Sequence, residues 1–339
     1  MTRTLVTGGC GFIGSNLMNR LLARGEDVVA FDNLSRRGSE KNAAWLESLY
    51  GDKFRVIRGD VRDADAIKAA ARDADIIYHL AAQVAVTTSV TDPRTDFEIN
   101  ALGTFNTLEA ARVAGRNPIF LYASTNKVYG AMEDLEIVEL PTRYAYRDIQ
   151  GFGEDQPLDF HSPYGCSKGA ADQYVRDYSR IYGLRSVVLR QSAIYGIRQF
   201  GVEDQGWMAW FVIAAVLGRP ITIYGDGKQV RDMLFVEDLI DAYDAAVVNI
   251  DRTAGHVYNM GGGPGRTISV WQEFAPRLAQ LLGRPIPVAH GDWRPGDQKV
   301  CIYDVSQAER ELGWKQKVGL DQGIEQLYRW VVENRPLFS

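Results

Sequence analysis

The sequence predicts an α/β protein with a doubly wound parallel sheet of the Rossmann type, followed by a smaller α/β region. From residue 1 to about 130, short apolar runs alternate with amphipathic helical stretches, a pattern typical of buried parallel strands joined by helices. A glycine-rich turn at residues 8–14 directly follows the first apolar run. The chain has 339 residues, of which 46% are hydrophobic, which suffices for one large or two fused domains.

The expected elements follow in order along the chain. Strands are predicted at residues 4–7, 28–31, 55–57, 76–80 and 119–123, with helices beginning near residues 12, 40, 63 and 92. Right-handed crossovers then place any ligand at the carboxyl ends of the strands. The polar segment 131–161 is predicted to be an inserted loop and a candidate lid. A helix carrying Tyr164 and a strand at 186–190 follow. We expect a dinucleotide-binding domain at 1–190, with the chain returning at about 234–260, and a mainly substrate-binding domain at 191–339.

Composition excludes several classes of function. The net charge is −5 and no basic run occurs, which argues against nucleic-acid or membrane-surface binding. Cys10, Cys166 and Cys301 are too scattered for a disulfide framework, and no metal site is expected. The chain begins with a strand, and no window has the roughly 18 apolar residues of a membrane helix. These features predict a cytoplasmic protein. His79 is expected to be a satisfied core residue, whereas His161, in a loop near Tyr164, could contact a substrate.

The glycine turn predicts a dinucleotide site. Gly8, Gly11 and Gly14 follow a strand and open a helix, where glycine permits a tight turn and a close approach of pyrophosphate to the helix N-terminus. Asp32 ends the second strand, and a carboxylate there accepts hydrogen bonds from ribose and repels a 2′-phosphate. NAD is therefore favoured over NADP, although Arg36 and Arg37 could hold such a phosphate if they are not part of a solvated loop. The residues expected around the dinucleotide are Gly8, Gly11, Phe12, Ile13, Gly14, Asp32, Asn33, Asp60, Val61, Leu80, Ala81, Ala82, Gln83 and Asn100.

Tyr164 and Lys168 are predicted to form a base. They are four residues apart and share one face of a helix. A free phenol has a pKa of about 10, so it is almost fully protonated at pH 7. We expect the Lys168 ammonium to favour the phenolate, which could then take a proton from a sugar hydroxyl.

Taken together, the motifs TGGCGFIG, FDNLS, GDVRD, HLAAQ, ASTNKVYG and SPYGCSKGAADQY resemble the extended short-chain dehydrogenase/reductase family of nucleotide-sugar enzymes. The resemblance covers nearly the whole chain. It implies that Thr125 orients the sugar, that Tyr164 abstracts its proton and that Lys168 holds the nicotinamide ribose while NAD receives a hydride. It also implies a homodimer, with a tetramer as the alternative, formed by helices at residues 97–114 and 163–182.

The residues after Thr125 distinguish reactions within this family. Dehydratases carry an Asp-Glu pair there and decarboxylases a Glu, whereas this chain has Asn126 and Lys127. A lysine, with an ordinary pKa of about 10.4, cannot replace a carboxylic acid in that role. Epimerisation needs no such pair. The segments 124–130, 158–174, 204–211 and 225–232 are similar to the CDP-tyvelose (CDP-paratose) 2-epimerase branch, which implies inversion of carbon 2 of a CDP-hexose. A UDP-hexose 4-epimerase and a non-catalytic nucleotide-sensing protein are the alternatives.

The same resemblance implies a set of substrate-binding residues. Arg231 and Arg294, in the segments 229–232 and 294–297, match the positive residues that hold the diphosphate. Ala193 stands where the family has an asparagine, so Ser192 or the backbone could replace its phosphate contact. Trp207, Trp210 and Phe211 could stack a cytosine or form core. The substrate-binding residues expected are Thr125, Asn126, Gln205, Arg231, Arg294 and Asp297.

Overall fold

The computed structural model describes residues 2–294 and 297–338, so Pro295 and Gly296 of the segment 294–297 lie outside the described residues. The described chain divides into two compact units. Unit 1 is formed by residues 2–128, 162–190 and 240–258, and unit 2 by the intervening and C-terminal residues. The predicted first domain, 1–190, included residues 129–161, which the structure instead places in unit 2. Within the described residues, no helix is both long and apolar enough to cross a membrane.

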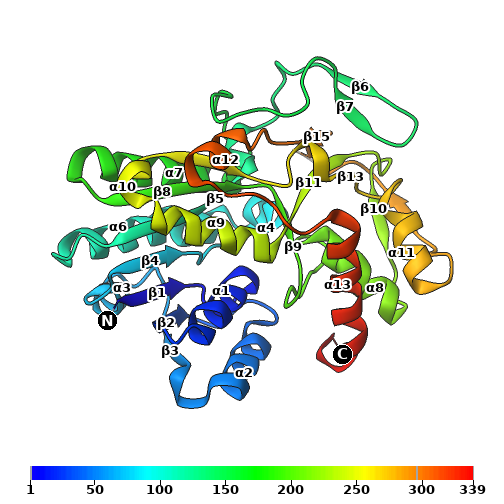
Figure 1. The fold of residues 1–339 in the computed structure, drawn as a ribbon. Helices are drawn as coiled ribbons and strands as arrows, with labels where there is room; N and C mark the ends of the chain where they lie inside the picture. Colours follow the sequence, from blue (N-terminus) through cyan, green and yellow to red (C-terminus); the bar gives the residue numbers. More distant parts are fainter. Residues whose placement is uncertain (1, 295–296, 339) are drawn as a thin grey trace. The chain divides into compact units, whose positions relative to one another are not determined.

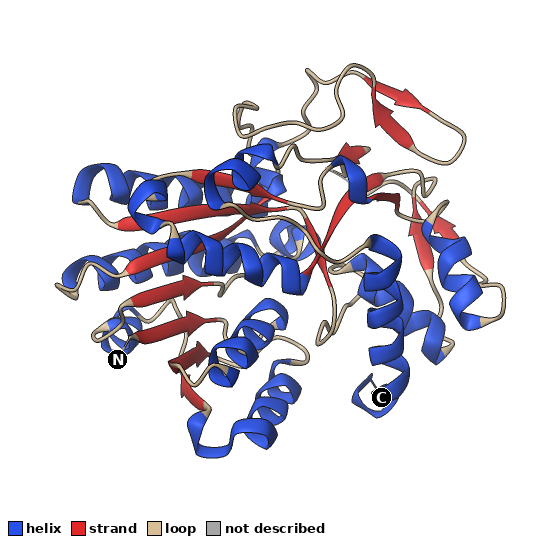
Figure 2. Cartoon of the chain, viewed as in Figure 1, coloured by secondary structure: helices blue, strands red, loops and turns tan. Residues whose placement is uncertain are grey.

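Unit 1 alternates strands and helices as the hydrophobic pattern predicts (Figures 1 and 2). Its elements are β1 (Arg3–Thr7), α1 (Phe12–Ala23), β2 (Asp27–Asp32), α2 (Ser39–Tyr50), β3 (Arg55–Arg58), α3 (Ala64–Ala71), β4 (Ile76–His79), α4 (Val86–Thr91), α5 (Pro93–Phe97), the π-helical η2 (Glu98–Leu102), α6 (Gly103–Val113), β5 (Ile119–Thr125), α7 (Ser162–Tyr182), β8 (Arg185–Gln191), α10 (Ile250–Thr253) and β12 (Val257–Met260). Helix α9 (Val236–Val248) begins in unit 2 and continues into unit 1.

The described strands of unit 1 form a seven-stranded sheet in the order β12-β8-β5-β4-β1-β2-β3 (Figure 1). Strand β1 pairs in parallel with both β2 and β4. The chain therefore builds the sheet outward from β1 toward β3 and then from β4 toward β8. Because crossovers are right-handed, this reversal puts α1 and α2 on one face of the sheet and α3 and α6 on the other. It also creates a switch point between β1 and β4, where ligands of such sheets bind.

Buried apolar side chains fix the two helix layers of unit 1. A core cluster joins Leu5 and Ile77 of the central strands to Ile67 of α3, Leu108 of α6 and Val175 of α7. On α1, Arg20 forms ion pairs with Asp241 and Asp244 of α9, so these two helices lie together. The doubly wound fold predicted from the sequence is confirmed.

Unit 2 contains short strands around β11 and several helices. Its remaining elements are β6 (Ile137–Glu139), β7 (Tyr144–Tyr146), β9 (Ala193–Tyr195), α8 (Trp207–Leu217), β10 (Thr222–Tyr224), β11 (Val230–Phe235), β13 (Thr267–Ser269), α11 (Phe274–Leu282), β14 (Ala289–Gly291), β15 (Val300–Cys301), α12 (Ser306–Leu312) and α13 (Leu320–Glu333). Strand β11 pairs in parallel with β9 and β15 and antiparallel with β13. Strand β10 pairs in parallel with β14.

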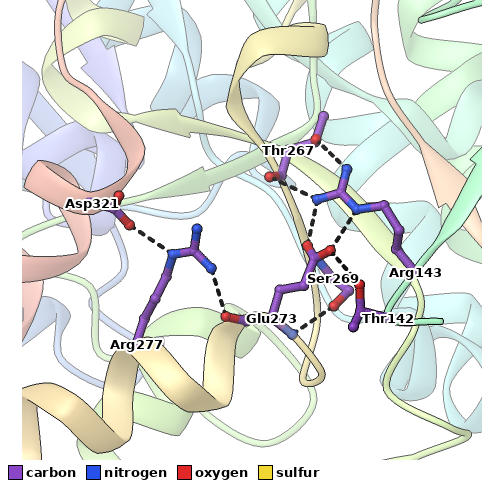
Figure 3. Close-up of polar contacts among 7 residues, drawn as sticks. All are labelled: Thr142, Arg143, Thr267, Ser269, Glu273, Arg277 and Asp321. Carbon is purple, nitrogen blue, oxygen red and sulfur yellow. Dashed lines mark hydrogen bonds and ion pairs between the residues drawn. The ribbon is translucent and has the colours of Figure 1, made fainter. Parts of the chain in front are cut away.

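The segment 131–161 is not the unstructured loop that its polar composition predicts. Strands β6 and β7 form an antiparallel hairpin, and Phe152 is buried. Figure 3 shows how this segment is fixed: Arg143 forms a bidentate ion pair with Glu273, which also accepts a hydrogen bond from Thr142. The composition of the segment could not predict these contacts, because each joins residues more than 100 positions apart in sequence.

Candidate active site

The glycine turn of unit 1 is shaped by close backbone contacts. Gly8 has φ +69°, a conformation that favours glycine. A Cβ atom on Gly14 would lie 2.1 Å from the carbonyl oxygen of Gly8, so the helix could not approach the turn with any larger residue. By contrast, a Cβ on Gly11 would meet only one atom, at 3.2 Å. Helix α1 begins there without a side-chain cap, so its first N–H groups suit an anionic ligand.

Two acidic residues predicted to contact a dinucleotide lie at the carboxyl ends of β2 and β3. Each carboxylate oxygen of Asp32 accepts one backbone N–H, from Cys10 at 2.9 Å and from Leu34 at 2.8 Å, and keeps acceptor capacity for a ligand. Asp60 is more heavily engaged. It accepts hydrogen bonds from Asn33 and from the Arg62 guanidinium, which lowers the pKa of Asp60 to about 2. Arg62 was not among the predicted residues.

A buried histidine organises the turn after β4. Thr104 donates its hydroxyl proton to Asn100 O at 2.6 Å, so His79 Nε2, 3.0 Å from Thr104 Oγ1, must be the donor of that pair. His79 Nδ1 then accepts from Thr7 Oγ1 at 2.8 Å. Thr7 Oγ1 in turn accepts from the N–H groups of Leu80 and Ala81. Burial lowers the pKa of His79 to about 3, and the prediction of a satisfied core histidine is confirmed.

Asn100 and Gln83 serve this turn through contacts within the protein. Asn100 accepts from Gln83 N at 2.9 Å and donates to Gln83 O at 3.1 Å. The Gln83 side chain donates to Ala85 O and to Asp96 and accepts from Ala85 N. Both amide side chains are therefore engaged by the chain itself, so they shape the turn after β4 through these contacts.

Unit 1 brings Thr125, Tyr164 and Lys168 together. Thr125 ends β5, and Tyr164 and Lys168 lie on the first turns of α7; all three are buried. Thr125 hydrogen bonds to Tyr164. Lys168 Nζ donates to Ala123 O at 2.7 Å and lies 4.2 Å from the centre of the Tyr122 ring. Asn126 adjoins this group, because its Oδ1 accepts from Thr125 Oγ1 at 3.3 Å.

The electrostatics of this group differ from the sequence-based expectation. Burial raises the pKa of Tyr164 to about 12, and the hydrogen bond from Thr125 only partly opposes this effect. Burial also lowers the pKa of Lys168 to about 7. The pKa of Tyr164 is therefore raised, whereas its spacing from Lys168 had predicted a lowered value, because desolvation of the phenol is the largest influence on it.

Helix α7 is anchored by a buried ion pair that the sequence analysis missed. Arg190 of β8 contacts Asp172 of α7 through two hydrogen bonds of 2.9 and 3.0 Å, and both residues are almost completely buried. Ser124 also donates to Asp172 at 2.7 Å. Asp172 is one helical turn beyond Lys168, but nothing in the sequence pairs it with a residue on β8.

In unit 2, the predicted diphosphate arginines have different surroundings. Arg231 is mostly buried, with 9% exposure, and donates to Asp297 at 2.7 Å and to Val230 O at 2.8 Å. Arg294 is more exposed, lies 4.0 Å from the centre of the Tyr224 ring and pairs with Asp204. The backbone of Gln205 closes a short turn with Val202.

Two further features of unit 2 answer alternatives left open by the sequence. Ser192 hydrogen bonds to the fully buried carboxylate of Asp232, so its hydroxyl is already used where a phosphate contact was considered. Trp207 and Phe211 pack against Phe274 in an aromatic cluster. These contacts favour the core interpretation of Trp207 and Phe211. His161 of unit 2 is exposed and pairs with Asp159 at 2.8 Å. Cys166, on α7 of unit 1, is also exposed.

Comparisons with known proteins agree with this arrangement. Residues 5–327 match the family model described as GDP-mannose 4,6 dehydratase. The chain is 43% identical to the CDP-paratose 2-epimerase of Salmonella typhi, over 97% of this chain and 98% of that protein. It is 36% identical to a UDP-glucose 4-epimerase of Mycolicibacterium smegmatis, over 95% and 96% of the two chains. A Thermus thermophilus UDP-glucose 4-epimerase, solved in complex with NAD, has a TM-score of 0.80 and 32% identity and covers 97% and 98% of the two chains.

Proposed function

Because the chain belongs to the extended short-chain dehydrogenase/reductase family, in the group described as GDP-mannose 4,6 dehydratase, we propose that it is an NAD-dependent nucleotide-sugar epimerase. We further propose that it inverts carbon 2 of a CDP-hexose, such as CDP-paratose and CDP-tyvelose or CDP-glucose and CDP-mannose. The juxtaposition of Thr125, Tyr164 and Lys168 in unit 1 carries the proposal. The identity to a CDP-paratose 2-epimerase over nearly the full length supports the choice of nucleotide and carbon.

The group description names a dehydratase, but the residues beside Thr125 do not suit dehydration. Asn126 and Lys127 follow Thr125, and neither can donate a proton as a carboxylic acid and then act as its conjugate base. Epimerisation requires one group that removes and later returns a proton at the sugar hydroxyl. Tyr164 can fill that role without a second acid or base, so the residues beside Thr125 favour an epimerase over a dehydratase.

The residues of unit 1 fit NAD. The uncapped start of α1 and the open side of Gly11 suit a pyrophosphate, and Asp32 keeps acceptor capacity for ribose hydroxyls. When bound, NAD would accept the hydrogen of the sugar carbon as a hydride and return it to the opposite face. Lys168 is proposed to bind the nicotinamide ribose.

The chain's own residues would move one proton. The hydrogen bond between Thr125 and Tyr164 places the phenol oxygen beside a hydroxyl that can orient a sugar. Tyr164 would take the proton of the sugar hydroxyl and return it after the flat ketone has turned over. Because burial raises the pKa of free Tyr164 to about 12, the base must form in the loaded site. Arg231, Arg294, Asp297, Gln205 and Asn126 are proposed to bind the substrate and prevent loss of the ketone.

Isotope labelling tests this function directly. The purified protein is incubated with CDP-glucose or CDP-paratose carrying deuterium at carbon 2, and the product sugar is identified by nuclear magnetic resonance. We expect inversion with the label retained, and Tyr164→Phe should lower kcat by about 100- to 10,000-fold. Inversion with loss of deuterium to solvent would show direct deprotonation and overturn the redox route.

A UDP-hexose 4-epimerase is the second candidate. It is favoured by the 36% identity to a UDP-glucose 4-epimerase. Parallel incubations with UDP-glucose separate the two functions, because the nucleotide and the inverted carbon both differ. Turnover of UDP-glucose alone would replace the CDP-hexose proposal.

We also propose that the protein is a homodimer through the outer faces of α6 and α7. Phe105 and Tyr174 form an exposed edge-to-face pair across these helices, with ring centres 6.0 Å apart. Phe97 and Ile181 extend the exposed apolar surface, at 57% and 66% exposure. Light scattering of the wild type and of Ile181→Asp checks this assembly, and a monomeric wild type would refute it.

A further inference from the structure

Asp96 of α5 is a fully buried carboxylate beside the catalytic helix. Its Oδ1 accepts from Gln83 Nε2 at 2.8 Å and from Asn100 Nδ2 at 3.1 Å. Its Oδ2 accepts from Ser167 Oγ at 2.5 Å. Asp96 therefore joins the turn after β4, the π-helical η2 and α7 through three neutral donors.

The first turns of α7 are held at two points, and this carboxylate provides one of them. Ser167 lies between Tyr164 and Lys168 in sequence and faces Asp96. The neighbouring helix α4 supplies a second fixed point, because Ser89 Oγ accepts from Tyr164 N at 3.1 Å. The start of α7 is thus held by side chains that do not belong to the predicted catalytic group.

Asp96 also carries a negative charge that no cation in the described residues neutralises by direct contact. The other buried carboxylate near Lys168, Asp172, is paired with Arg190 through two hydrogen bonds. The groups around the Lys168 ammonium are otherwise neutral: the Tyr122 ring and Ala123 O from β5, His79 from β4 and Tyr164 from its own helix. The ammonium of Lys168 is the cation that interacts electrostatically with Asp96.

We propose that Asp96 is a positioning residue that holds the start of α7 through Ser167 and presents its negative charge to Lys168. The proposal rests on the proposed function only for its kinetic consequence. Burial is the largest influence on both neighbours, because it lowers the pKa of Lys168 and raises that of Tyr164. A negative charge favours the protonated state, so Asp96 raises the pKa of Tyr164 and, after the larger effect of Asp172, that of Lys168. Removing the charge should therefore lower both values.

Asp96→Asn separates charge from hydrogen bonding. The amide oxygen can still accept from Gln83 and Asn100, while the amide nitrogen donates to Ser167 Oγ. The Ser167 hydroxyl can then donate to Tyr164 O, which already lies 3.2 Å away. Ser167→Ala is the matched control, because it removes the clamp and retains the charge. If the asparagine variant does not fold, Asp96→Ser, which leaves room for a water, takes its place.

The first measurement needs neither substrate nor turnover. Lysine labelled with carbon-13 at Cε is incorporated, and the Lys168 signal is assigned by its absence in Lys168→Met. The Lys168 titration should move to lower pH by about one to two units in Asp96→Asn and by much less in Ser167→Ala. An unchanged titration in Asp96→Asn overturns the proposal, whatever reaction the protein catalyses.

The second measurement is the pH dependence of kcat with the substrate established above. Both limbs of the profile should move to lower pH in Asp96→Asn, so the variant loses more activity at pH 8 than at pH 6. Ser167→Ala should lose activity about equally at both values. If Asp96→Asn lost the same fraction of kcat at all pH values, the role of Asp96 would be structural only. Absence of epimerase activity in the wild type, with a shifted Lys168 titration, would refute the proposed function and leave this inference standing.

Discussion

Two arginine–aspartate pairs, one in each unit, have the same chemistry and different surroundings. In unit 1, Arg190 contacts both oxygens of Asp172, and the side chains are 2% and 0% exposed. In unit 2, Arg231 makes a single contact with Asp297, and these side chains are 11% and 25% exposed. A buried bidentate pair fixes two elements against each other, whereas a partly exposed pair with one contact leaves guanidinium donors for a ligand.

Removing Arg190 should have the largest effect. Arg190→Met leaves the Asp172 carboxylate buried without a cation, and the unfolding free energy should fall by about 3–5 kcal/mol. Arg185→Met is the control on the same strand, because Arg185 pairs with the exposed Asp251; it should cost less than about 1 kcal/mol. Urea unfolding followed by circular dichroism measures both. Similar losses in the two variants would end the distinction between buried and exposed pairs.

The next largest expected effect is on the pH dependence of the unfolding free energy, which differs between carboxylates of the two units. Burial raises the pKa of Asp232 in unit 2 to about 6, so the folded state holds its proton more tightly than the unfolded state does. The stabilisation that comes from this tighter proton binding is fully present below pH 3.8. It is lost as the pH rises to 6, so the unfolding free energy falls by about 3 kcal/mol over this range. Asp232→Asn should lack this decline when unfolding free energies are measured at pH 4 and pH 7.

Asp60 in unit 1 should change the unfolding free energy with pH in the opposite direction to Asp232. Its pKa is lowered to about 2 by Arg62, so its contribution is present above pH 3.8 and is lost as the pH falls toward 2. Asp60→Asn should therefore change the acid side of the stability profile. If Asp232→Asn and Asp60→Asn altered the profile in the same direction, the assignment of the two carboxylates would be wrong.

Arg231→Met should act mainly on binding. A lost charge-assisted hydrogen bond to a diphosphate is worth about 1.5–3 kcal/mol, so KM for the nucleotide sugar should rise about 10- to 100-fold with little change in kcat. The unfolding free energy should change far less than in Arg190→Met. Initial-rate kinetics and urea unfolding of the same preparation decide this. A variant that unfolds like Arg190→Met, with KM unchanged, would make Arg231 structural.

The smallest effect concerns the β6–β7 hairpin (Figure 3). Arg143→Met removes a partly buried bidentate pair with Glu273 and should cost about 1–2 kcal/mol. Arg277→Met, which removes an exposed pair with Asp321, should cost less than about 0.5 kcal/mol. Thermal unfolding of the two variants gives the difference. Equal shifts would show that burial of the hairpin pair contributes nothing.

The sequence predicted the parts of the fold that depend on local pattern. Every strand predicted from an apolar run in unit 1 is present within one or two residues of its expected bounds, because buried parallel strands have a distinctive composition. The glycine turn was equally predictable, since Gly14 is required by backbone contacts with Gly8 and Gly9 and Gly8 has a positive φ. The hairpin at residues 137–146 was missed because its partners, such as Glu273, lie far along the chain.

The sequence predicted that Thr125, Tyr164 and Lys168 lie close together, but it did not predict their electrostatics. The spacing of Tyr164 and Lys168 placed them on one helix face, but pKa values depend on burial, which spacing does not contain. The supporting groups Thr7, Asp96, Asp172 and Arg190 were missed for the same reason. Each contacts the site through a hydrogen bond to a residue on another strand or helix, and no short motif records such a contact.

The order of strands in the sheet has a consequence for how the protein is made. Strand β12 borders β8 at one edge of the sheet, yet it is encoded after the second passage of the chain through unit 2. A nascent polypeptide that has left the ribosome only as far as residue 190 therefore presents the β8 edge with open backbone groups, a template for pairing with another chain. Translation must reach residue 260 before that edge is covered, so truncated products that stop short of it should be prone to aggregation.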